Sequence, residues 1–301
     1  MSKQDTREYE VILWGATGFT GALVARHLVA TYGDELKWAI AGRNREKLER
    51  LREELGTPEL PVIEADSGNR KSLDAMAAST RVVCTTVGPY ALYGDELLAA
   101  CAAAGTDYCD LTGEVQWMAR NIAQHLPAAK KSGARIVHTC GFDSIPSDLG
   151  TWFLQQHMLD QFGEYADEVK SRVGKFSGGA SGGTIASMMQ MMEEASGDPA
   201  VQEAMENPYS LNPEGEQWGP DEIDTNRPEY DDDFGQWTAP FVMAAINARV
   251  VRRSTALAGY PWGTEFRFSE RLLTGDGHGG KARAAGLGIG SQLTPLVMAL
   301  K

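Results

Sequence analysis

A glycine-rich motif near the start of the chain constrains its fold more than any other sequence feature. The segment GATGFTG follows an apolar run that predicts a strand over 9–14, and it begins a helical pattern over 19–32. In that context the first glycine permits a tight turn, the second leaves room for a diphosphate, and the third lets the helix pack closely. The free N–H groups and the positive end of the helix favour phosphate. The motif therefore predicts a dinucleotide site with these candidate contacts: Gly15, Ala16, Thr17, Gly18, Phe19, Thr20 and Gly21.

Strand and helix patterns alternate through the rest of the first half. After the first pair, the predicted strands lie at 37–41, 61–65, 81–86, 108–111 and 135–140, and the predicted helices at 45–55, 70–78, 94–104 and 115–132. This alternation is typical of a parallel sheet with helices on both faces. It disfavours the alternative that the glycines form a turn without a ligand. We therefore predict an α/β fold whose first domain, residues 1–145, is a Rossmann-like doubly wound parallel sheet.

The second half of the chain has a different pattern and predicts a separate substrate domain at 146–301. Its predicted elements are helices at 148–162, 184–195 and 239–256, strands at 167–176 and 263–273, and a long loop over the acidic segment 193–233. Helices and strands that do not alternate indicate an α+β domain. The run Met188–Met192 suits an adaptable acyl pocket, although a helix core explains it equally well.

The negative charge of the chain gathers in one segment. With 28 Lys and Arg against 41 Asp and Glu, the net charge is −13, and residues 193–233 alone carry 14 acidic residues against Arg227. An acidic chain is a poor partner for nucleic acid, which is bound through cationic side chains. Cys84, Cys101, Cys109 and Cys140 form no C-x-x-C pair, so a zinc site is not expected. We therefore expect neither a nucleic-acid partner nor a bound metal.

The two ends of the chain bear on its location. The first ten residues are polar and charged and lack the apolar core of a signal peptide, which predicts a cytoplasmic protein. The C-terminal stretch 282–300 contains Arg283, Gln292 and Pro295 and is too weak for a spanning helix. We expect a buried helix pair there rather than a segment that lies against a membrane. Peripheral membrane or lipid association and a homodimer are left open.

The residues after the second predicted strand indicate which nucleotide the site prefers. NAD-preferring sites place an acidic residue there to hold the ribose hydroxyls, whereas this chain has Arg43 and Asn44. An arginine can pair with a 2′-phosphate and stack on adenine, so we predict NADP(H). The alternative is a solvated arginine at the start of an exposed helix. Asp66 and Ser67, after the third strand, are candidate adenine contacts or, equally, a helix cap.

The loop after the fourth predicted strand is expected to face the nicotinamide ribose, because ligands bind beyond the carboxyl ends of such strands. Gly88 and Pro89 are expected to shape a backbone wall there, and Val87 is a further candidate cofactor contact. Tyr90 and Tyr93 can supply a proton or simply pack. Of the two, Tyr93 is taken as a catalytic candidate.

The loops after the fifth and sixth predicted strands supply acids at the same edge of the sheet. Asp110, Glu114 and Asp143 are the acids expected to reach a substrate. Ser144 is better explained as the cap of the helix that follows. His138 lies inside a strand, where a satisfied core histidine is expected. The catalytic candidates are therefore Tyr93, Asp110, Glu114 and Asp143.

Two patterns from other enzyme classes bear on this assignment. Gly179–Gly183 fits the G-x-S-x-G pattern of a hydrolase nucleophile, but the one later histidine, His278, lies in a glycine-rich loop. A turn that lines the substrate cleft explains the segment better. No tyrosine has a lysine four residues later, so the usual Tyr-x-x-x-Lys pair of reductases is absent. Nicotinamide chemistry needs the protein only to orient the cofactor and supply a proton.

The motifs occur in an order that resembles the saccharopine dehydrogenase-like oxidoreductases, in particular the trans-acting enoyl reductase branch. The segments that carry the resemblance cover nearly the whole chain. They are Gly15–Gly21, Ala41–Asn44, Val87–Gly94, Tyr108–Glu114, Cys140–Asp148, Ser177–Ala186 and Trp237–Asn247. The resemblance implies an NADP-binding fold followed by an α+β domain with a mixed sheet. Members usually run on past the length of this chain, so it also implies a truncated second domain.

The resemblance implies an activity as well. Actinobacterial members of the family reduce enoyl intermediates in complex-lipid assembly, and animal relatives are associated with lipid droplets. We therefore expect an NADP(H)-dependent oxidoreductase that reduces an enoyl or acyl lipid intermediate. One alternative is a saccharopine-type amino-acid reductase, for which Arg249, Arg252 and Arg253 are available to bind substrate carboxylates. Another is a non-catalytic NADP(H) sensor or scaffold, since fold alone does not establish activity.

Overall fold

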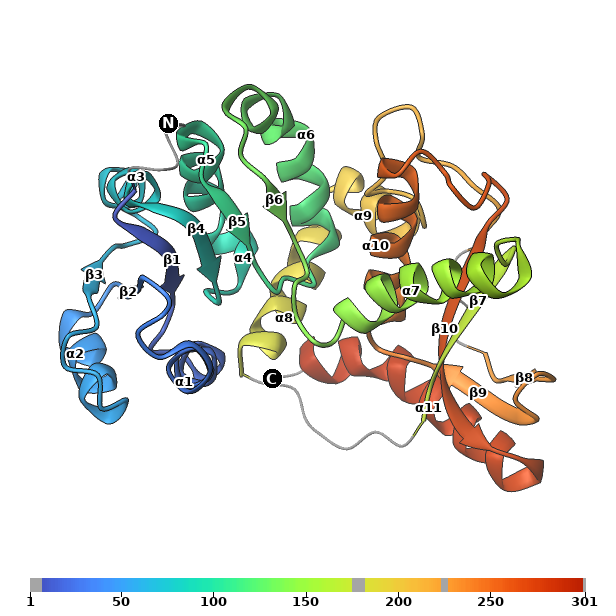
Figure 1. The fold of residues 1–301 in the computed structure, drawn as a ribbon. Coiled ribbons are helices and arrows are strands. Elements are labelled where there is room, and N and C mark those ends of the chain that lie inside the picture. Colours follow the sequence, from blue (N-terminus) through green and yellow to red (C-terminus); the bar gives the residue numbers. More distant parts are fainter. Residues whose placement is uncertain (1–6, 175–181, 223–226, 300–301) are drawn as a thin grey trace. The chain divides into compact units, whose positions relative to one another are not determined.

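The computed structural model describes residues 7–174, 182–222 and 227–299 (Figure 1). The chain divides between Gly141 and Phe142 into two compact units, here called unit 1 and unit 2. Each unit has its own sheet and its own buried core. The first three residues of the G-x-S-x-G segment, 179–181, lie outside the described residues.

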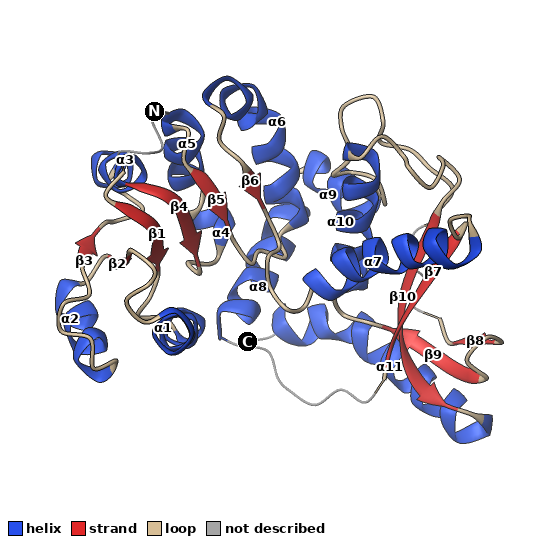
Figure 2. Cartoon of the chain, in the orientation of Figure 1, coloured by secondary structure: helices blue, strands red, loops and turns tan. Residues whose placement is uncertain are grey.

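Unit 1 is built around a six-stranded parallel sheet (Figure 2). Its strands are β1 (Tyr9–Trp14), β2 (Trp38–Gly42), β3 (Val62–Glu64), β4 (Thr80–Thr85), β5 (Asp107–Cys109) and β6 (Ile136–Val137). The order is β3-β2-β1-β4-β5-β6, with every neighbouring pair parallel. Ligands of such sheets bind at the carboxyl ends of the strands where the order reverses, here between β1 and β4. The predicted Rossmann-like sheet is confirmed.

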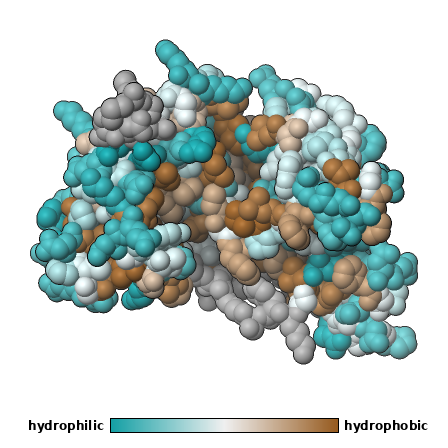
Figure 3. All heavy atoms as spheres, in the orientation of Figure 1, coloured by the Kyte–Doolittle hydropathy of each residue, from teal (hydrophilic) through white to brown (hydrophobic). Residues whose placement is uncertain are grey.

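Helices cover both faces of this sheet (Figure 1). They are α1 (Phe19–Tyr32), α2 (Arg45–Glu54), α3 (Arg70–Ser79), α4 (Tyr90–Tyr93), α5 (Asp95–Ala104) and α6 (Val115–Ser132). Helices α1 and α2 pack on one face, where Leu13, Ile40 and Leu48 are fully buried. On the other face, α3 packs against α5 and α5 against α6. The outer side of α2 is charged and is hydrophilic in Figure 3.

Local residue chemistry sets the ends of these helices. The Asn44 side chain accepts the Lys47 N–H at 2.9 Å and so caps the start of α2. At the other end, Gly105 and Gly133 stop α5 and α6 in the left-handed conformation, with φ angles of 70° and 82°. Glycine is preferred there because it has no Cβ. Asn44 thus ends the loop between β2 and α2, and the two glycines begin the short connections into β5 and β6.

Unit 2 contains a mixed four-stranded sheet of order β7-β10-β9-β8. Its strands are β7 (Glu168–Val173), β8 (Glu229–Asp231), β9 (Gln236–Pro240) and β10 (Arg267–Gly275), and its helices are α7 (Ile145–Phe162), α8 (Gly182–Gly197), α9 (Pro199–Glu206), α10 (Ala244–Leu257) and α11 (Gly277–Ala299). Strand β10 is parallel to β7 and antiparallel to β9. Val251 of α10 packs with Val169 and Phe268 of the sheet. The predicted α+β fold with a mixed sheet is confirmed.

Three predictions for unit 2 are wrong. The acidic segment is not one long loop, because α9 and β8 lie within it. Residues 239 and 240 end β9, and the helix begins only at Ala244. The C-terminal stretch belongs to one helix, α11, rather than to a helix pair. Among the helices of the described residues, none combines the length and the apolar character that crossing a membrane requires.

Candidate functional site

The glycine loop of unit 1 has the geometry that its sequence predicts. Gly15 has a φ of 87°, and a Cβ there would lie 2.6 Å from Val87 Cγ2. A Cβ on Gly21 would lie 2.1 Å from Gly15 O, so only glycine lets α1 approach the loop this closely. Gly18 differs, because the nearest atom to a Cβ there would be Gly15 O at 3.3 Å. Gly18 is thus less crowded than Gly15 and Gly21, although 3.3 Å is still a tight contact for a Cβ, and its lack of a side chain is what lets a diphosphate approach the backbone.

The amides of Gly15, Ala16 and Gly18 are bonded to backbone carbonyls, so the amides available to a ligand are those of the first turn of α1. Ala16 is buried and its N–H donates to a carbonyl of β2 at 3.3 Å, whereas Thr17 and Phe19 are exposed and Thr20 is half-buried. Gly18 is the N-cap of α1 and, as a glycine, supplies no side-chain acceptor to the first turn. First-turn N–H groups have no partner within their own helix. Together with the helix dipole, they are suited to bind a phosphate at this end of α1, which stays a prediction.

The end of β2 places a cation beside this loop. The Gly15 N–H donates to Ala41 O at 2.9 Å, which ties the glycine loop to β2. Two residues later, Arg43 is exposed and makes no ion pair or hydrogen bond within the described residues. The Asn44 side chain caps α2 through its oxygen, and its contact with the nucleotide stays a prediction. Arg43 is therefore available to a 2′-phosphate, and the residues present fit NADP(H).

Asp66 and Ser67, which follow β3, are predicted either to contact adenine or to cap a helix, and the hydrogen bonds there bear on the second explanation. Asn69 is the cap of α3, since Asn69 Oδ1 accepts the Ser72 N–H at 3.3 Å. The helix-cap alternative for Asp66 is therefore wrong. Asp66 Oδ1 instead accepts the Gly68 N–H at 2.8 Å within a turn, and Ser67 is half-buried. Contact of these two residues with adenine stays a prediction.

A buried glutamate holds the loop after β4. Glu114 is 1% exposed, and its two carboxylate oxygens accept the N–H groups of Tyr90 and Ala91, each at 2.8 Å. These amides begin α4, directly after the predicted wall of Gly88 and Pro89. Val87, just before that wall, contacts the glycine loop, so the two loops lie together. Because both of its oxygens accept backbone N–H groups, Glu114 holds the backbone that follows the wall in place.

Asp110 is the centre of a second buried arrangement in unit 1. One of its oxygens accepts the N–H groups of Thr112 at 3.1 Å and Thr139 at 3.0 Å. The other lies 2.6 Å from His138 Nδ1. Thr139 has a φ of 57°, which non-glycine residues adopt only when their surroundings hold them there. Asp110, which is 2% exposed, therefore orders the ends of β5 and β6.

His138 agrees only in part with the expectation of a satisfied core histidine. Its side chain is 9% exposed and packs edge-on against Trp117 and Tyr108. Its Nδ1 is paired with Asp110, but its Nε2 is buried without a hydrogen-bond partner among the described residues. The prediction that His138 lies inside a strand is wrong, since β6 ends at Val137. Sequence reasoning missed this pair, because each residue directly follows a different strand and the two share no motif.

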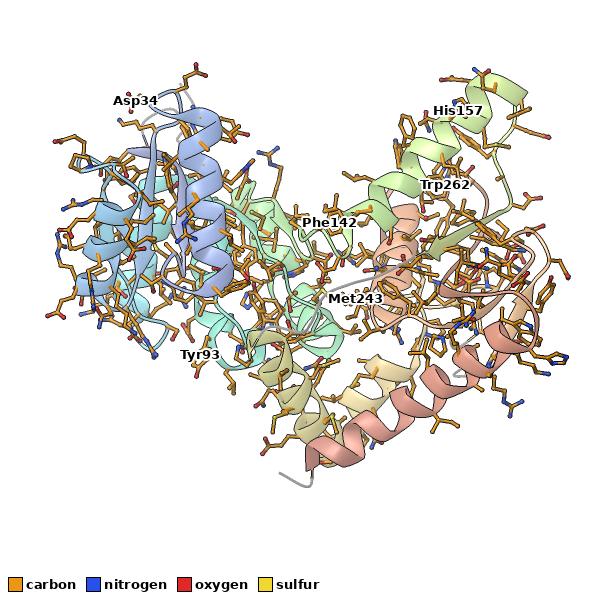
Figure 4. All side chains as sticks on the ribbon, turned by 90° about the horizontal axis from the view of Figure 1, so that it is seen from below. Asp34, Tyr93, Phe142, His157, Met243 and Trp262 are labelled. Carbon is orange, nitrogen blue, oxygen red and sulfur yellow. The ribbon has the colours of Figure 1, made fainter. Side chains whose placement is uncertain are left out.

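The tyrosines near this edge differ in their availability as proton donors. Burial, with a contribution from nearby Asp110, raises the pKa of Tyr90 and Tyr108 well above 10. The Tyr90 hydroxyl also donates to Thr85 O at 3.2 Å. Tyr93 lies at the end of α4, is 38% exposed, and stands at the edge of unit 1 in Figure 4. Of these three hydroxyls, that of Tyr93 is the most accessible to a ligand.

Asp143 is the predicted site residue that lies in unit 2. It precedes α7, is exposed, and its carbonyl accepts the Asn247 Nδ2–H at 2.8 Å. Ser144 is the N-cap of α7 by position, but its hydroxyl bonds no helix amide, so the predicted side-chain cap is wrong. Asn247 was not predicted from the sequence. A polar residue on the inner face of an amphipathic helix is the one signal that could have indicated it.

The arginines expected to serve a saccharopine-type site are engaged within unit 2. Arg252 Nε lies 2.7 Å from Asp221 Oδ2. Arg249 and Arg253 donate to backbone carbonyls between residues 205 and 211. These contacts fold the acidic segment against α10. The three side chains are therefore not free to bind substrate carboxylates.

Comparison with known families and proteins gives several likenesses. The saccharopine dehydrogenase NADP binding domain matches residues 11–137, which lie in unit 1. A Mycobacterium leprae protein named trans-acting enoyl reductase is 40% identical over 283 residues, which cover 90% of this chain and 67% of that protein. A Mycobacterium tuberculosis protein of the same name is 41% identical over 278 residues, covering 89% of this chain and 66% of that protein.

A second Mycobacterium tuberculosis relative, provisionally named for the same activity, is 43% identical over 280 residues. The chain spans about two thirds, 66%, of the length of both M. tuberculosis proteins. Among solved structures, apo saccharopine dehydrogenase (L-Glu forming) from Saccharomyces cerevisiae is similar over 88% of this chain and 55% of that one. Its identity is 15% and its TM-score 0.48.

Proposed function

Since the chain belongs to the saccharopine dehydrogenase-like oxidoreductases, in the trans-acting enoyl reductase branch, we propose that it reduces the double bond of an enoyl-acyl substrate with NADPH. The observation that carries the proposal is the unpaired Arg43 beside the glycine loop. This arrangement joins a phosphate-binding helix end to a free cation, as NADPH with its additional 2′-phosphate requires.

Arg43→Ala is expected to weaken NADPH binding about tenfold and to leave NADH binding within about twofold, because only NADPH carries the 2′-phosphate. Fluorescence titration of the wild type and the variant with each nucleotide measures the effect. Arg45→Ala is the matched control, since Arg45 is exposed on the same turn but pairs with Glu49 at 3.3 Å. This role of Arg43 would be contradicted if Arg43→Ala lost affinity equally for NADPH and NADH, or lost affinity for neither nucleotide.

The proposed reaction adds a hydride to the β carbon of the enoyl group and a proton to the α carbon. Bound NADPH supplies the hydride. We propose Tyr93 or Asp143 as the proton donor, because both side chains are exposed. Asp110 and Glu114 then serve as positioning residues, since their oxygens hold the loops after β4, β5 and β6.

Helix α8 supports an apolar acyl substrate. It carries the run Met188–Met192, and none of its described residues is buried. Within the run, every residue except Met189 is half-buried, so packing in a helix core stays an alternative. Met189 is 48% exposed and Ile185 39%. Because methionine side chains adapt to irregular apolar surfaces, we propose that α8 contributes to binding the acyl chain of a lipid intermediate.

Two other functions would give different results in a turnover assay. A saccharopine-type reductase would consume NADPH only with an amino acid and an aldehyde, and the engaged arginines of α10 count against it. A sensor or scaffold would bind NADPH without consuming it. Purified protein incubated with NADPH and either enoyl thioesters or amino acid with aldehyde therefore distinguishes the three functions.

A further inference from the structure

A buried polar cluster joins four elements of unit 2. Glu270 of β10 is 3% exposed and Asn247 of α10 is 1% exposed. Glu270 Oε1 accepts the hydroxyls of Ser147 at 2.6 Å and Ser171 at 3.0 Å, and Oε2 accepts the Asn247 Nδ2–H at 2.7 Å. Helices α7 and α10 and strands β7 and β10 therefore meet at one carboxylate.

Neutral donors surround this carboxylate. Among the described residues, the hydrogen-bond partners of Glu270 are two hydroxyls and an amide, with no cation. Ser147 is the third residue of α7 and Asn247 the fourth of α10. The positive ends of two helix dipoles thus lie beside Glu270, which offsets part of the cost of burying its charge. The cluster fixes both helix ends relative to β10.

The same cluster reaches the loop that carries Asp143. Asn247 Nδ2 lies 2.8 Å from Asp143 O and 3.2 Å from Ser147 Oγ, so one amide contacts both ends of the segment 143–147. The Asp143 side chain is exposed, and Phe142 before it is 91% exposed. Figure 4 shows Phe142 and Met243 at the N-terminal ends of α7 and α10. The position of the exposed pair 142–143 therefore depends on Asn247.

We propose that Asn247 and Glu270 are positioning residues of the substrate site, which hold the backbone at Asp143 so that its carboxylate is presented to the enoyl substrate. Neither residue touches the substrate itself. Glu270 orients the Asn247 amide, and Asn247 fixes the Asp143 carbonyl. This inference rests on the proposed function, because it concerns how the proposed site handles its substrate.

Asn247→Ala tests the proposal, because it removes the amide that contacts Asp143 O. We expect kcat/KM for an enoyl thioester to fall about tenfold to a hundredfold, since misplacement of a reacting group by about 1 Å has effects of this size. NADPH affinity should stay within about twofold. Hydrogen exchange of the amides over 142–147 should become faster, whether or not turnover is measured.

Ser254→Ala is the matched control. The Ser254 hydroxyl lies 3.1 Å from Asp148 Oδ2 and so also connects α10 to α7, one residue beyond the segment 143–147. A role that is only structural predicts that both variants lose thermal stability and keep the kinetic constants of the wild type. The positioning role predicts a kinetic loss in Asn247→Ala alone.

Glu270→Gln keeps the proposal testable if Asn247→Ala folds poorly. The glutamine oxygen can still accept the Asn247 Nδ2–H, and its amide can donate to the hydroxyl oxygens of Ser147 and Ser171, which accept as well as donate. We expect Glu270→Gln to retain kcat/KM within about threefold, and Glu270→Ala to lose as much as Asn247→Ala.

A folded Asn247→Ala variant with wild-type kinetic constants and unchanged exchange over 142–147 would overturn the proposal. If the wild type binds NADPH but reduces no enoyl thioester, the proposed function fails, and positioning of an enoyl substrate fails with it. Hydrogen exchange in Asn247→Ala then still decides whether Asn247 holds the Asp143 segment. The two failures are therefore distinguishable.

Discussion

Replacing Gly21 by alanine is expected to abolish tight NADPH binding and to lower the stability of unit 1. A Cβ at this position would lie 2.1 Å from Gly15 O and 2.8 Å from Ala16 Cα, and neither backbone atom can yield. Helix α1 would have to move away from the loop, so its first-turn N–H groups would no longer converge on a phosphate. We expect a loss of about a hundredfold in NADPH affinity, about 2.7 kcal/mol, by titration.

Gly150→Ala is the control for this experiment. A Cβ on Gly150 would meet open space, so alanine there should leave NADPH binding unchanged. It should raise the thermal stability slightly, because alanine is about 1 kcal/mol more favourable than glycine inside a helix. If Gly21→Ala instead binds NADPH as tightly as the wild type, the N-terminus of α1 does not hold the nucleotide phosphate.

Removing the carboxylate of Glu114 is expected to have the second large effect. Both of its oxygens accept backbone N–H groups, from Tyr90 and Ala91, and the residue is 1% exposed. Glu114→Ala leaves two amides without acceptors at a buried position, at about 1–3 kcal/mol each. We therefore expect urea denaturation to show a free energy of unfolding lower by about 2–6 kcal/mol.

Glu96→Ala is the control for Glu114→Ala. The Glu96 carboxylate is 54% exposed and pairs with Arg70 at 3.0 Å. Exposed pairs of this kind contribute about 0–1 kcal/mol, so little change is expected. The free energy of unfolding of Glu114→Gln should lie between those of Glu114→Ala and Glu96→Ala, because one side-chain oxygen remains as an acceptor. A Glu114→Ala variant as stable as Glu96→Ala would show that the carboxylate does not hold the loop after β4.

The elements predicted most accurately are those whose ends carry local signals. Helices α1 and α6 begin and end at the predicted residues, and each stops at a glycine, Gly33 and Gly133. The glycine loop was predictable for the same reason, since Gly15 and Gly21 encode a turn and a close approach of backbone. Local sequence therefore predicts the conformation of the glycine loop.

Elements that depend on contacts distant in sequence could not be predicted in this way. Helix α4 has four residues, and its first amides are held by Glu114, which lies 24 residues after Tyr90. The acidic segment folds because arginines of α10 bind its carbonyl groups and Asp221. The roles of Asp110 and Glu114 as anchors likewise follow from partners that the sequence does not place beside them.

Helix α7 shows how hydrophobic periodicity can mislead. Its buried residues are polar, namely Ser147, Thr151 and Gln155, while Leu149 and Phe153 are 57% and 76% exposed. Polar contacts, not apolar packing, determine its inner face, as the bond from Ser147 to Glu270 shows. The apolar stripe of such a helix predicts the wrong face as the buried one. A prediction from that stripe therefore also misses the polar residues that anchor Asp143.

Incubation of the purified protein with NADPH labelled with deuterium at C4 and an enoyl thioester tests the proposed activity most directly. Mass spectrometry of the acyl product shows where the hydride goes. We predict a saturated product that carries the deuterium at the β carbon when the label is on the transferred face, and an unlabelled saturated product when it is on the opposite face. Recovery of intact enoyl thioester beside bound, unoxidised NADPH would contradict the assignment of this chain as an enoyl reductase.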